Sequence, residues 1–409
     1  MILRLAWRNI GRNKRRTALT VAAAVFAVVL TVQMIALTTG VHEGMIESNV
    51  RLHAGHLQVT GAGYLEDRTL ERFARWTPAL ASAVDGADGV AAAAPRVNGF
   101  ALLSNGTASQ GVALLGVDPE RESRVTTWPK RVVTGSFLGG AAREIVLGER
   151  VAQALRVRVG DEVLVYSAAY TLENVYEFFR VRGVFRSPDP ALDRSLALIP
   201  LADAQELFVY GDRVSEVALI ARDARRVPET QRAVAAAVAR ASQEPLDVNP
   251  WQRVMPELEQ MLAIDDAQNY SMLAILIVVV AFGLLNTILM SVLERQRELG
   301  VMLALGLPPR ALFALVYVES LLLSGIGLLV GLALAVPAAA IMQRHPIPLT
   351  GEVAEMTAQF GIEPVITWKL EAWNPVAATL VMVGIALLAA LYPAAKAATA
   401  RPVDALRSL

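Results

Sequence analysis

The sequence contains no cysteine and only four histidines among its 409 residues. The absence of cysteine excludes disulfide bonds, thiolate catalysis and cysteine-based metal sites. The shortage of histidine argues against a histidine-rich metal centre. His53 and His56 lie close together in the segment HAGH, but two histidines without an obvious third ligand are more typical of strand or surface positions. We therefore expect no metal and no bound cofactor.

A nucleotide-binding loop of the form G-x-x-x-x-G-K-[ST] is also missing. No lysine of the chain follows a glycine; the lysines are Lys14, Lys130, Lys369 and Lys396. If ATP is used, a partner subunit has to bind it, and we predict that this chain is not itself an enzyme. The formal net charge is +0, which gives no reason to expect a nucleic-acid partner.

Apolar residues, in contrast, are abundant. They make up 54% of the chain, charged residues make up 19%, and the mean hydropathy is +0.43. These values are too apolar for an ordinary soluble protein. About 20 apolar residues cross the ~30 Å hydrocarbon core of a bilayer as a helix. Four segments meet this rule and are predicted transmembrane helices: 17–41, 271–293, 311–343 and 375–395. The first is too long for the apolar region of a signal peptide, so we interpret it as an uncleaved anchor.

Basic residues predict the orientation of these helices, because short cytoplasmic segments are enriched in arginine and lysine. Arginine and lysine gather in 1–16, in 294–310 and in 396–409. We expect these three segments, and so both termini, to be cytoplasmic. The segments 42–270 and 344–374 are then external, and the chain is a multi-pass membrane protein.

The segment 42–270 is predicted to be a folded α+β domain. Short β-rich runs are bounded by turn residues: HLQVTG, GVALLGV, REIVLG, DEVLVYS, FFRVRGVF, LALIP and SEVALIA. GERVAQALRV and VPETQRAVAAAVARAS have helical spacing. Apolar residues beyond position 41 and a helix start at Pro256 predict that the first two membrane helices continue outward as a stalk. The stalk could carry motion or be a static spacer. The predicted fold is a membrane α-helical protein with one plus three helices and a large external domain inserted between helices one and two.

The stretch MSVLERQRELGVMLALGLPPRAL, residues 290–312, predicts a cytoplasmic elbow. We expect helix two to continue through its charged residues until Gly306, where Pro308 and Pro309 force a turn. Leu299 and its apolar neighbours are too few to span the membrane. This apolar face therefore lies on the membrane or docks on a protein. A solvated charged turn is the simpler alternative for the charges alone.

Residues 1–16 are predicted to form an amphipathic helix at the membrane surface, with arginines toward lipid phosphates and apolar residues at headgroup depth. The arginine side carries Arg4, Arg8 and Arg12, and the apolar side carries Leu3, Trp7 and Ile10. The alternative is a cluster of charges that only sets the topology.

Glu319 is the only charged residue in the third membrane helix. An intramembrane carboxylate is a functional hypothesis by default. We favour a polar contact within the bundle, with Asn286 or Thr287 as candidate partners, over a proton relay. The motif Gly327-x-x-x-Gly331 permits close helix packing, within the chain or at a dimer seam.

Three segments resemble the MacB/FtsX-type permeases of ABC transporters. They are LAWRNIGRNKRRTALT at the start, NTILMSVLERQRELGVMLALGL after helix two, and GIGLLVGL in helix three. IVLGERVAQALRVRVGDEVLV is similar to the extracytoplasmic core domain of that family. The resemblance covers nearly the whole chain and is nearest to the lipoprotein-releasing, LolC/LolE-like branch, which lacks a fused ATPase.

The resemblance implies that the elbow is a coupling helix seated on a separate ATP-binding subunit. The residues expected to face that subunit are Glu294, Arg295, Arg297, Glu298, Leu299, Gly300, Ala304, Leu305 and Gly306. It further implies a dimer with a second copy or a paralogue, contacts with membrane lipids, and a periplasmic lipoprotein or adaptor as a further partner. ATP-driven closure would pass through stalk helices to the outer domains. The expected function is lipoprotein release or export of another periplasmic-side substrate. An FtsX-like relay that switches an external cell-wall hydrolase and a passive receptor or anchor are the alternatives.

Overall fold

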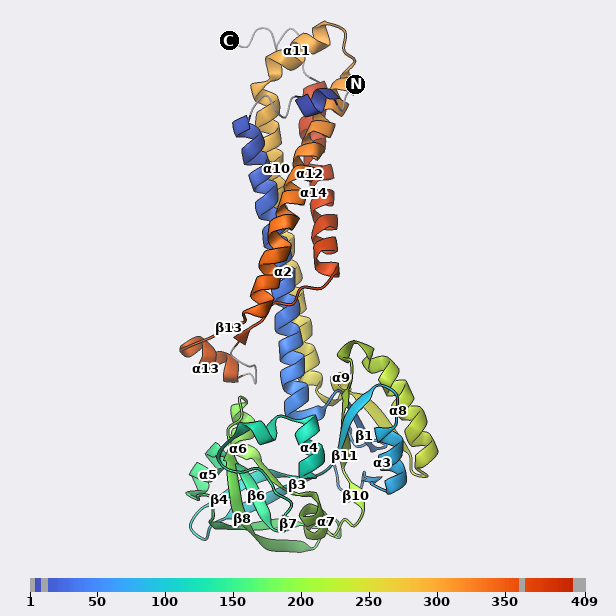
Figure 1. Cartoon of the computed structure of the whole chain (residues 1–409), viewed down its shortest axis with the longest axis vertical. Coiled ribbons are helices and arrows are strands. Elements are labelled where there is room, and N and C mark those ends of the chain that lie inside the picture. The colour runs from blue at the N-terminus through green and yellow to red at the C-terminus, as the bar shows by residue number, and fades with distance from the viewer. Residues whose placement is uncertain (1–3, 9–13, 360–364, 400–409) are drawn as a thin grey trace. The chain divides into compact units, whose positions relative to one another are not determined.

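The structure is a computed structural model that describes residues 4–8, 14–359 and 365–399. The chain divides into two compact units. The membrane unit comprises 1–43, 262–348 and 365–409, and the outer unit comprises 44–261 and 349–364. Each unit is described by itself below, with the elements labelled as in Figure 1.

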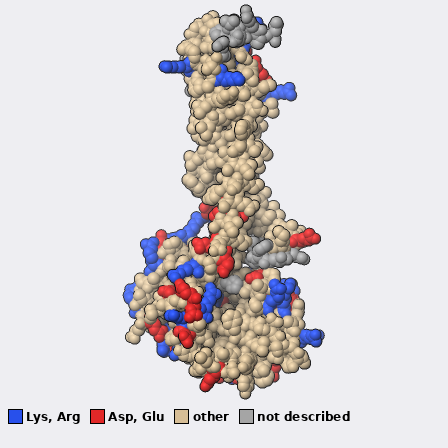
Figure 2. All heavy atoms as spheres, turned by 180° about the vertical axis from the view of Figure 1, so that it is seen from behind, with Lys and Arg blue, Asp and Glu red and all other residues tan. Residues whose placement is uncertain are grey.

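The membrane unit contains four long helices, α2 (Lys14–Asn49), α10 (Pro256–Glu294), α12 (Pro309–Arg344) and α14 (Trp373–Ala398). Within the described residues, these four are long and apolar enough to cross a membrane. Proline occupies the first position of α10 and of α12, where its fixed φ suits a helix start and its missing N–H costs nothing. The side of the unit visible in Figure 2 is almost free of charge along the helices, and Lys and Arg appear near the end that carries α11.

Small and aliphatic side chains fill the centre of this helix bundle. Ala24 and Val28 of α2, Leu284 of α10, Ala335 of α12 and Met382 of α14 belong to one buried cluster. Most of α10 remains exposed in the isolated chain, as expected for a helix whose apolar side chains face lipid or another subunit.

The outer unit is built on a ten-stranded sheet in the order β12-β1-β11-β3-β4-β9-β6-β8-β5, with β7 paired to β3 and β8. Its longer strands are β1 (Leu57–Gly61), β3 (Val90–Ser104), β4 (Ser109–Val117), β6 (Glu144–Gly148), β7 (Glu162–Ala168), β8 (Asn174–Phe185), β9 (Leu196–Pro200), β11 (Glu216–Ala221) and β12 (Leu246–Pro250). β5 (Val132–Gly135) completes the sheet. Most pairs are antiparallel, and β4–β9 and β6–β8 are parallel.

Short helices cover this sheet. They are α3 (Pro78–Asp85), α4 (Pro119–Val125), α5 (Glu149–Leu155), α6 (Pro190–Ser195), α7 (Leu201–Leu207), α8 (Val227–Ala241) and α9 (Trp251–Val254). Figure 1 shows α3 and α8 beside β1 and β11, whereas α5 and α6 accompany β6 and β8. Side-chain oxygens of Thr77, Asp118 and Asp189 accept backbone N–H groups at the starts of α3, α4 and α6, which satisfies donors that a helix start leaves unpaired.

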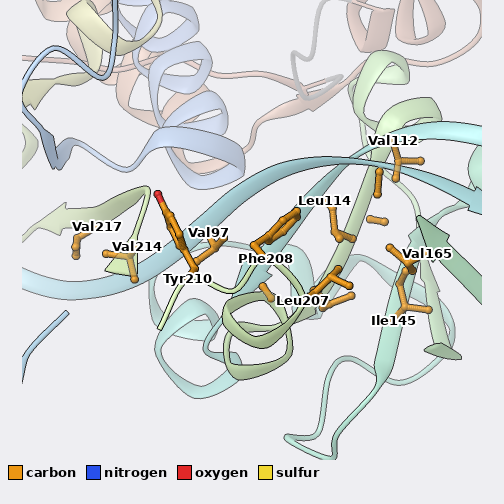
Figure 3. Close-up of a cluster of buried hydrophobic side chains, with 14 of the residues drawn as sticks. Val97, Val112, Leu114, Ile145, Val165, Leu207, Phe208, Tyr210, Val214 and Val217 are labelled. Atoms are coloured by element: carbon orange, nitrogen blue, oxygen red, sulfur yellow. The ribbon is translucent and has the colours of Figure 1, made fainter. Parts of the chain in front are cut away.

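The core of the outer unit lies between the sheet and these helices. Figure 3 shows strand residues such as Val97, Leu114 and Val165 meeting Leu207 at the end of α7 and the adjacent Phe208. The alternating burial of β7 follows the period of two that places successive side chains on opposite faces of a strand.

Every run predicted as a strand forms one, and both predicted helices of this domain form as α5 and α8. The long strand β3 was not predicted, because its first half is alanine-rich and lacks the β-branched pattern that marks a strand. The segment 344–374, expected to be a loop, contains a small hairpin of β13 (Ile347–Pro348) and β14 (Val365–Ile366). It also contains the helix α13 (Glu352–Gln359).

Candidate coupling site

The elbow is a separate short helix, α11 (Gln296–Ala304), between α10 and α12. We predicted one continuous helix through the charged residues, and this is wrong. The helix is interrupted at Arg295, whose φ of −107° and ψ of 12° lie outside the helical range. The elbow can therefore take a direction of its own.

The predicted end of the elbow at Gly306 is confirmed. Gly306 has a φ of +94°, a conformation that glycine adopts without steric cost. Its N–H donates to the Leu303 carbonyl at 3.0 Å, and the Leu307 N–H donates to the Met302 carbonyl at 3.0 Å. This hydrogen-bond pattern is the Schellman motif, which satisfies the last carbonyls of a helix. α12 then begins at Pro309.

The apolar face of α11 packs on the chain's own helices. Leu299 is 3% exposed and belongs to a buried cluster with Ala6, Leu312 and Ala394. Met302, Leu303 and Leu307 pack against the same cluster. The face that we expected to dock on a membrane or a partner is thus satisfied inside the protein, and it attaches the elbow to α12 and α14.

Arg295 strengthens this attachment through Glu319 of α12. Its Nη1 donates to Oε1 of Glu319 at 3.0 Å and to Oε2 at 3.2 Å, and its Nε donates to Glu298 at 3.2 Å. The Arg295 and Glu319 side chains are only 13% and 8% exposed. Glu319 therefore has a polar partner as expected, but the partner is Arg295. Asn286 is exposed, and the Thr287 hydroxyl donates to the Gly283 carbonyl.

The opposite face of the elbow is exposed. It combines charged and apolar residues, and Leu305 alone is 83% exposed. We name this set the outward face: Glu294, Arg297, Glu298, Val301, Ala304, Leu305 and Gly306. Of the residues predicted to face an ATP-binding subunit, Arg295, Leu299 and Gly300 turn inward. Val301, 40% exposed, was not predicted.

The amphipathic segment is described only in part. Residues 4–8 are helical, with Arg4 and Arg8 exposed and Trp7 62% exposed. Ala6 of the same turn is fully buried beside the elbow. The predicted positions of Leu3, Ile10 and Arg12 lie outside the described residues.

Gly327 and Gly331 are the places where α12 meets α2. A Cβ on Gly327 would lie 2.4 Å from the Cβ of Ala24, and one on Gly331 would lie 2.7 Å from the Cβ of Val28. Real Cβ atoms do not come so close, so the two helices approach over bare backbone. The glycine motif therefore serves contact within the chain.

Sequence reasoning missed a set of contacts at the other end of the bundle. The Lys369 N–H donates to the Ala36 carbonyl at 2.9 Å, and the Thr367 hydroxyl donates to the Gly40 carbonyl at 2.9 Å. Lys369 also pairs with Glu43, and His42 contacts Asp265 of α10. These contacts join the end of α2 to α10 and to the segment before α14. These contacts join residues more than 200 positions apart, and local sequence patterns do not predict which distant residues meet.

The outer unit also has a buried network of ion pairs that we did not predict from the sequence. Arg96, 2% exposed, donates to Glu122 at 2.7 Å and to Glu216 at 3.2 Å. Both carboxylates hold the guanidinium charged, which raises the pKa of Arg96 against the effect of burial. Buried charges require such pairing.

Two family models match the chain. The MacB-like periplasmic core domain matches residues 17–237, and the FtsX-like permease C-terminal domain matches residues 270–402. The first model alone covers more than half of the chain. The protein therefore belongs to the MacB/FtsX-type family of ABC transporter permeases, and its α+β unit, inserted between the first and second membrane helices, is the MacB-like periplasmic core domain.

Curated relatives agree with this family. The lipoprotein-releasing system transmembrane protein LolC of Neisseria meningitidis is 25% identical over 78% of this chain and 78% of its own length. A macrolide export ATP-binding/permease protein MacB of Nitrobacter winogradskyi is 26% identical over 81% of this chain and 51% of its own. The periplasmic region of MacB from Actinobacillus actinomycetemcomitans matches with 15% identity and a TM-score of 0.38, over 52% of this chain and 96% of that one. The protein is a multi-pass permease of the bacterial inner membrane.

Proposed function

We propose that this chain couples ATP hydrolysis by a separate ATP-binding subunit to conformational work in its periplasmic domain, and that the work is the release of lipoproteins from the membrane. The observation that carries the proposal is the two-sided elbow. One face of α11 is attached to the bundle through Leu299 and Arg295, and the outward face presents exposed charged and apolar residues.

This geometry supports a transmission role for physical reasons. Val301 and Leu305 are exposed, and covering their apolar surface with a partner would make a favourable contribution to the free energy of binding. Arg297 and Glu298 beside them give that contact specificity. Because the inward face is packed and ion-paired, a push on α11 is transmitted to α12 and α10 instead of being absorbed by a loose turn.

The helices α2 and α10 supply the next step. Each begins or ends in the membrane unit and contributes its other end to the outer unit. Motion of α10 at the elbow thus has a helical path to the periplasmic domain. ABC ATPases form their sites between two nucleotide-binding subunits, so we expect two permeases per complex, either two copies of this chain or this chain and a paralogue, with both termini in the cytoplasm.

The choice of lipoprotein as cargo is supported by the relatives named LolC. The test is reconstitution with the ATP-binding subunit that co-purifies with the chain. The variant Arg297→Glu reverses an exposed charge of the outward face and leaves the contact between Arg295 and Glu298 in place. The matched control is Arg232→Glu, which reverses an exposed arginine of α8.

The elbow variant is expected to bind the ATP-binding subunit about 5–150-fold more weakly, which corresponds to ~1–3 kcal/mol for a partly desolvated charged contact. The control should bind normally. ATP-dependent release of a lipoprotein from proteoliposomes should fall with the loss of binding. Normal binding and release by the elbow variant would contradict coupling through this face. ATP-driven activity without any lipoprotein release would favour the relay function instead.

A further inference from the structure

The outer unit has a cavity of about 840 Å³, partly open to solvent, between its sheet and the chain segments that join it to α2 and α10. Its volume lies within the ~300–1,000 Å³ that is usual for small-molecule sites.

One wall of the cavity is apolar. Leu52, Leu115, Trp128 and Leu196 line it and belong to, or pack against, one buried cluster. Trp128 is 1% exposed, and its indole N–H has no hydrogen-bond partner among the described residues. A buried indole N–H normally has an acceptor, so this wall combines a long apolar surface with one unsatisfied donor.

Polar groups of the lining are joined by hydrogen bonds. The Asn98 amide donates to the Tyr64 hydroxyl at 3.1 Å and to Glu216 at 2.9 Å, and Arg96 donates to the other oxygen of Glu216 at 3.2 Å. Burial raises the pKa of Tyr64 to about 12. Its hydroxyl is therefore neutral at physiological pH, and it also hydrogen-bonds with Ser215.

Four charged residues line the cavity. Arg68 and Glu257 are exposed, whereas Arg96 and Glu216 are buried and paired with each other, and both oxygens of Glu216 already accept hydrogen bonds. Arg96 is further neutralised by Glu122 behind it. An ionised ligand group placed beside Asn98 would meet Arg96 and Glu216, which already pair with each other, and would lose its hydration there at a cost. A neutral group that can donate and accept hydrogen bonds has no such cost.

We propose that this cavity binds a neutral amphiphile. Its apolar chain lies along the wall of Leu115 and Trp128, and its uncharged head (a hydroxyl, ester or amide) hydrogen-bonds at Tyr64 and Asn98. The inference goes beyond the proposed function and stands without it, because binding requires neither ATP nor a partner subunit.

The test uses the purified full chain in lipid nanodiscs. The probe is a monoacylglycerol that carries a photoreactive diazirine in its acyl chain, and labelled peptides are located by mass spectrometry. Labelling is expected in the segments around Leu115 and Trp128. A free fatty acid with the same chain should label these segments at least tenfold less, because its carboxylate is charged.

Variants separate the cavity from unspecific labelling. Leu115→Trp narrows the cavity at its apolar wall and should reduce labelling at least tenfold. The control Leu102→Trp adds the same side chain on the exposed face of β3 and should leave labelling unchanged. Ala113→Leu, a smaller change in the same wall, serves if the first variant does not fold. Tyr64→Phe should weaken monoacylglycerol binding about 5–10-fold, the loss of one hydrogen bond.

Three results would overturn the proposal. They are labelling confined to the membrane helices, undiminished labelling in a folded cavity-filling variant, and equal labelling by the fatty acid. Either of the first two results would show that the amphiphile does not bind in this cavity. The third would show that the cavity does not select a neutral head group.

Discussion

Arg295 holds Glu319 through both carboxylate oxygens, at 3.0 and 3.2 Å, across the junction where the elbow leaves α10. A carboxylate in a membrane helix is expensive unless a partner compensates it. If α11 swung freely, Glu319 would be separated from Arg295. The pair therefore favours an elbow that moves together with α12.

The first prediction concerns this pair. Arg295→Met removes the hydrogen-bonded cation that Arg295 supplies to Glu319 and should destabilise the bundle by about 1–3 kcal/mol, typical of losing a charged hydrogen bond. The double variant Arg295→Met/Glu319→Leu should recover most of that loss, because it removes both charges of the pair. Thermal unfolding in nanodiscs measures both. Arg297→Met, on the outward face, is the matched control and should cost less than about 1 kcal/mol. Equal effects of Arg295→Met and the control would show that the pair does not stabilise the elbow.

The second prediction concerns the contact between α2 and α12. Gly327→Ala should destabilise the bundle by about 1–3 kcal/mol, since its methyl group would overlap Ala24. Gly325→Ala, two residues earlier, meets no atom within 4 Å and should be neutral or slightly stabilising. The comparison is made by thermal unfolding of the two variants. Similar melting temperatures would argue that α2 and α12 do not touch at Gly327.

The third prediction is a pH dependence of the outer unit. Burial lowers the pKa of His56, and its Nδ1 accepts the Ala221 N–H, which only an unprotonated Nδ1 can do. Because the folded pKa lies below the unfolded value of about 6.5, protonation favours the unfolded state. The stabilisation is present above pH 6.5 and is lost as the pH falls through the folded pKa.

The outer unit should therefore melt at a lower temperature at pH 5 than at pH 7.5. His56→Asn offers an amide oxygen in place of Nδ1 and cannot be protonated, so its melting temperature should depend less on pH. Hydrogen exchange of the β1 and β11 amides, read at both pH values, locates the effect. A variant as pH-sensitive as the parent protein would exclude His56 as the source.

The fourth prediction concerns orientation. The chain has no cysteine, so a single introduced thiol is the only one. Ser109→Cys, exposed in the outer unit, should react with a membrane-impermeant maleimide in cells whose outer membrane alone is permeabilised. Ala304→Cys, on the outward face of the elbow, should react only after the inner membrane is opened. The reverse pattern would place the elbow in the periplasm and remove the basis of the coupling proposal.

The sequence alone determined the features that depend on local chemistry. Apolar runs long enough to cross a bilayer mark the four membrane helices, because about 20 apolar residues are needed to span the hydrocarbon core as a helix. Gly306 and the prolines after it end the elbow, since their backbone preferences act within one turn. The β-rich runs of the outer domain form strands for the same reason. The absence of a phosphate-binding loop also follows from the sequence, which has no G-x-x-x-x-G-K-[ST] pattern.

Tertiary structure decided which of these residues meet. Nothing near Arg295 indicates that it turns inward to a glutamate 24 positions later. Leu299 and Gly300, which were also expected to face the ATP-binding subunit, are buried. The ion network of Arg96, the glycine contact with α2 and the cavity beside Trp128 likewise arise from segments distant in sequence. Pairing of such segments depends on the shape and packing of complete elements, and a buried charge selects its partner only after those elements have come together.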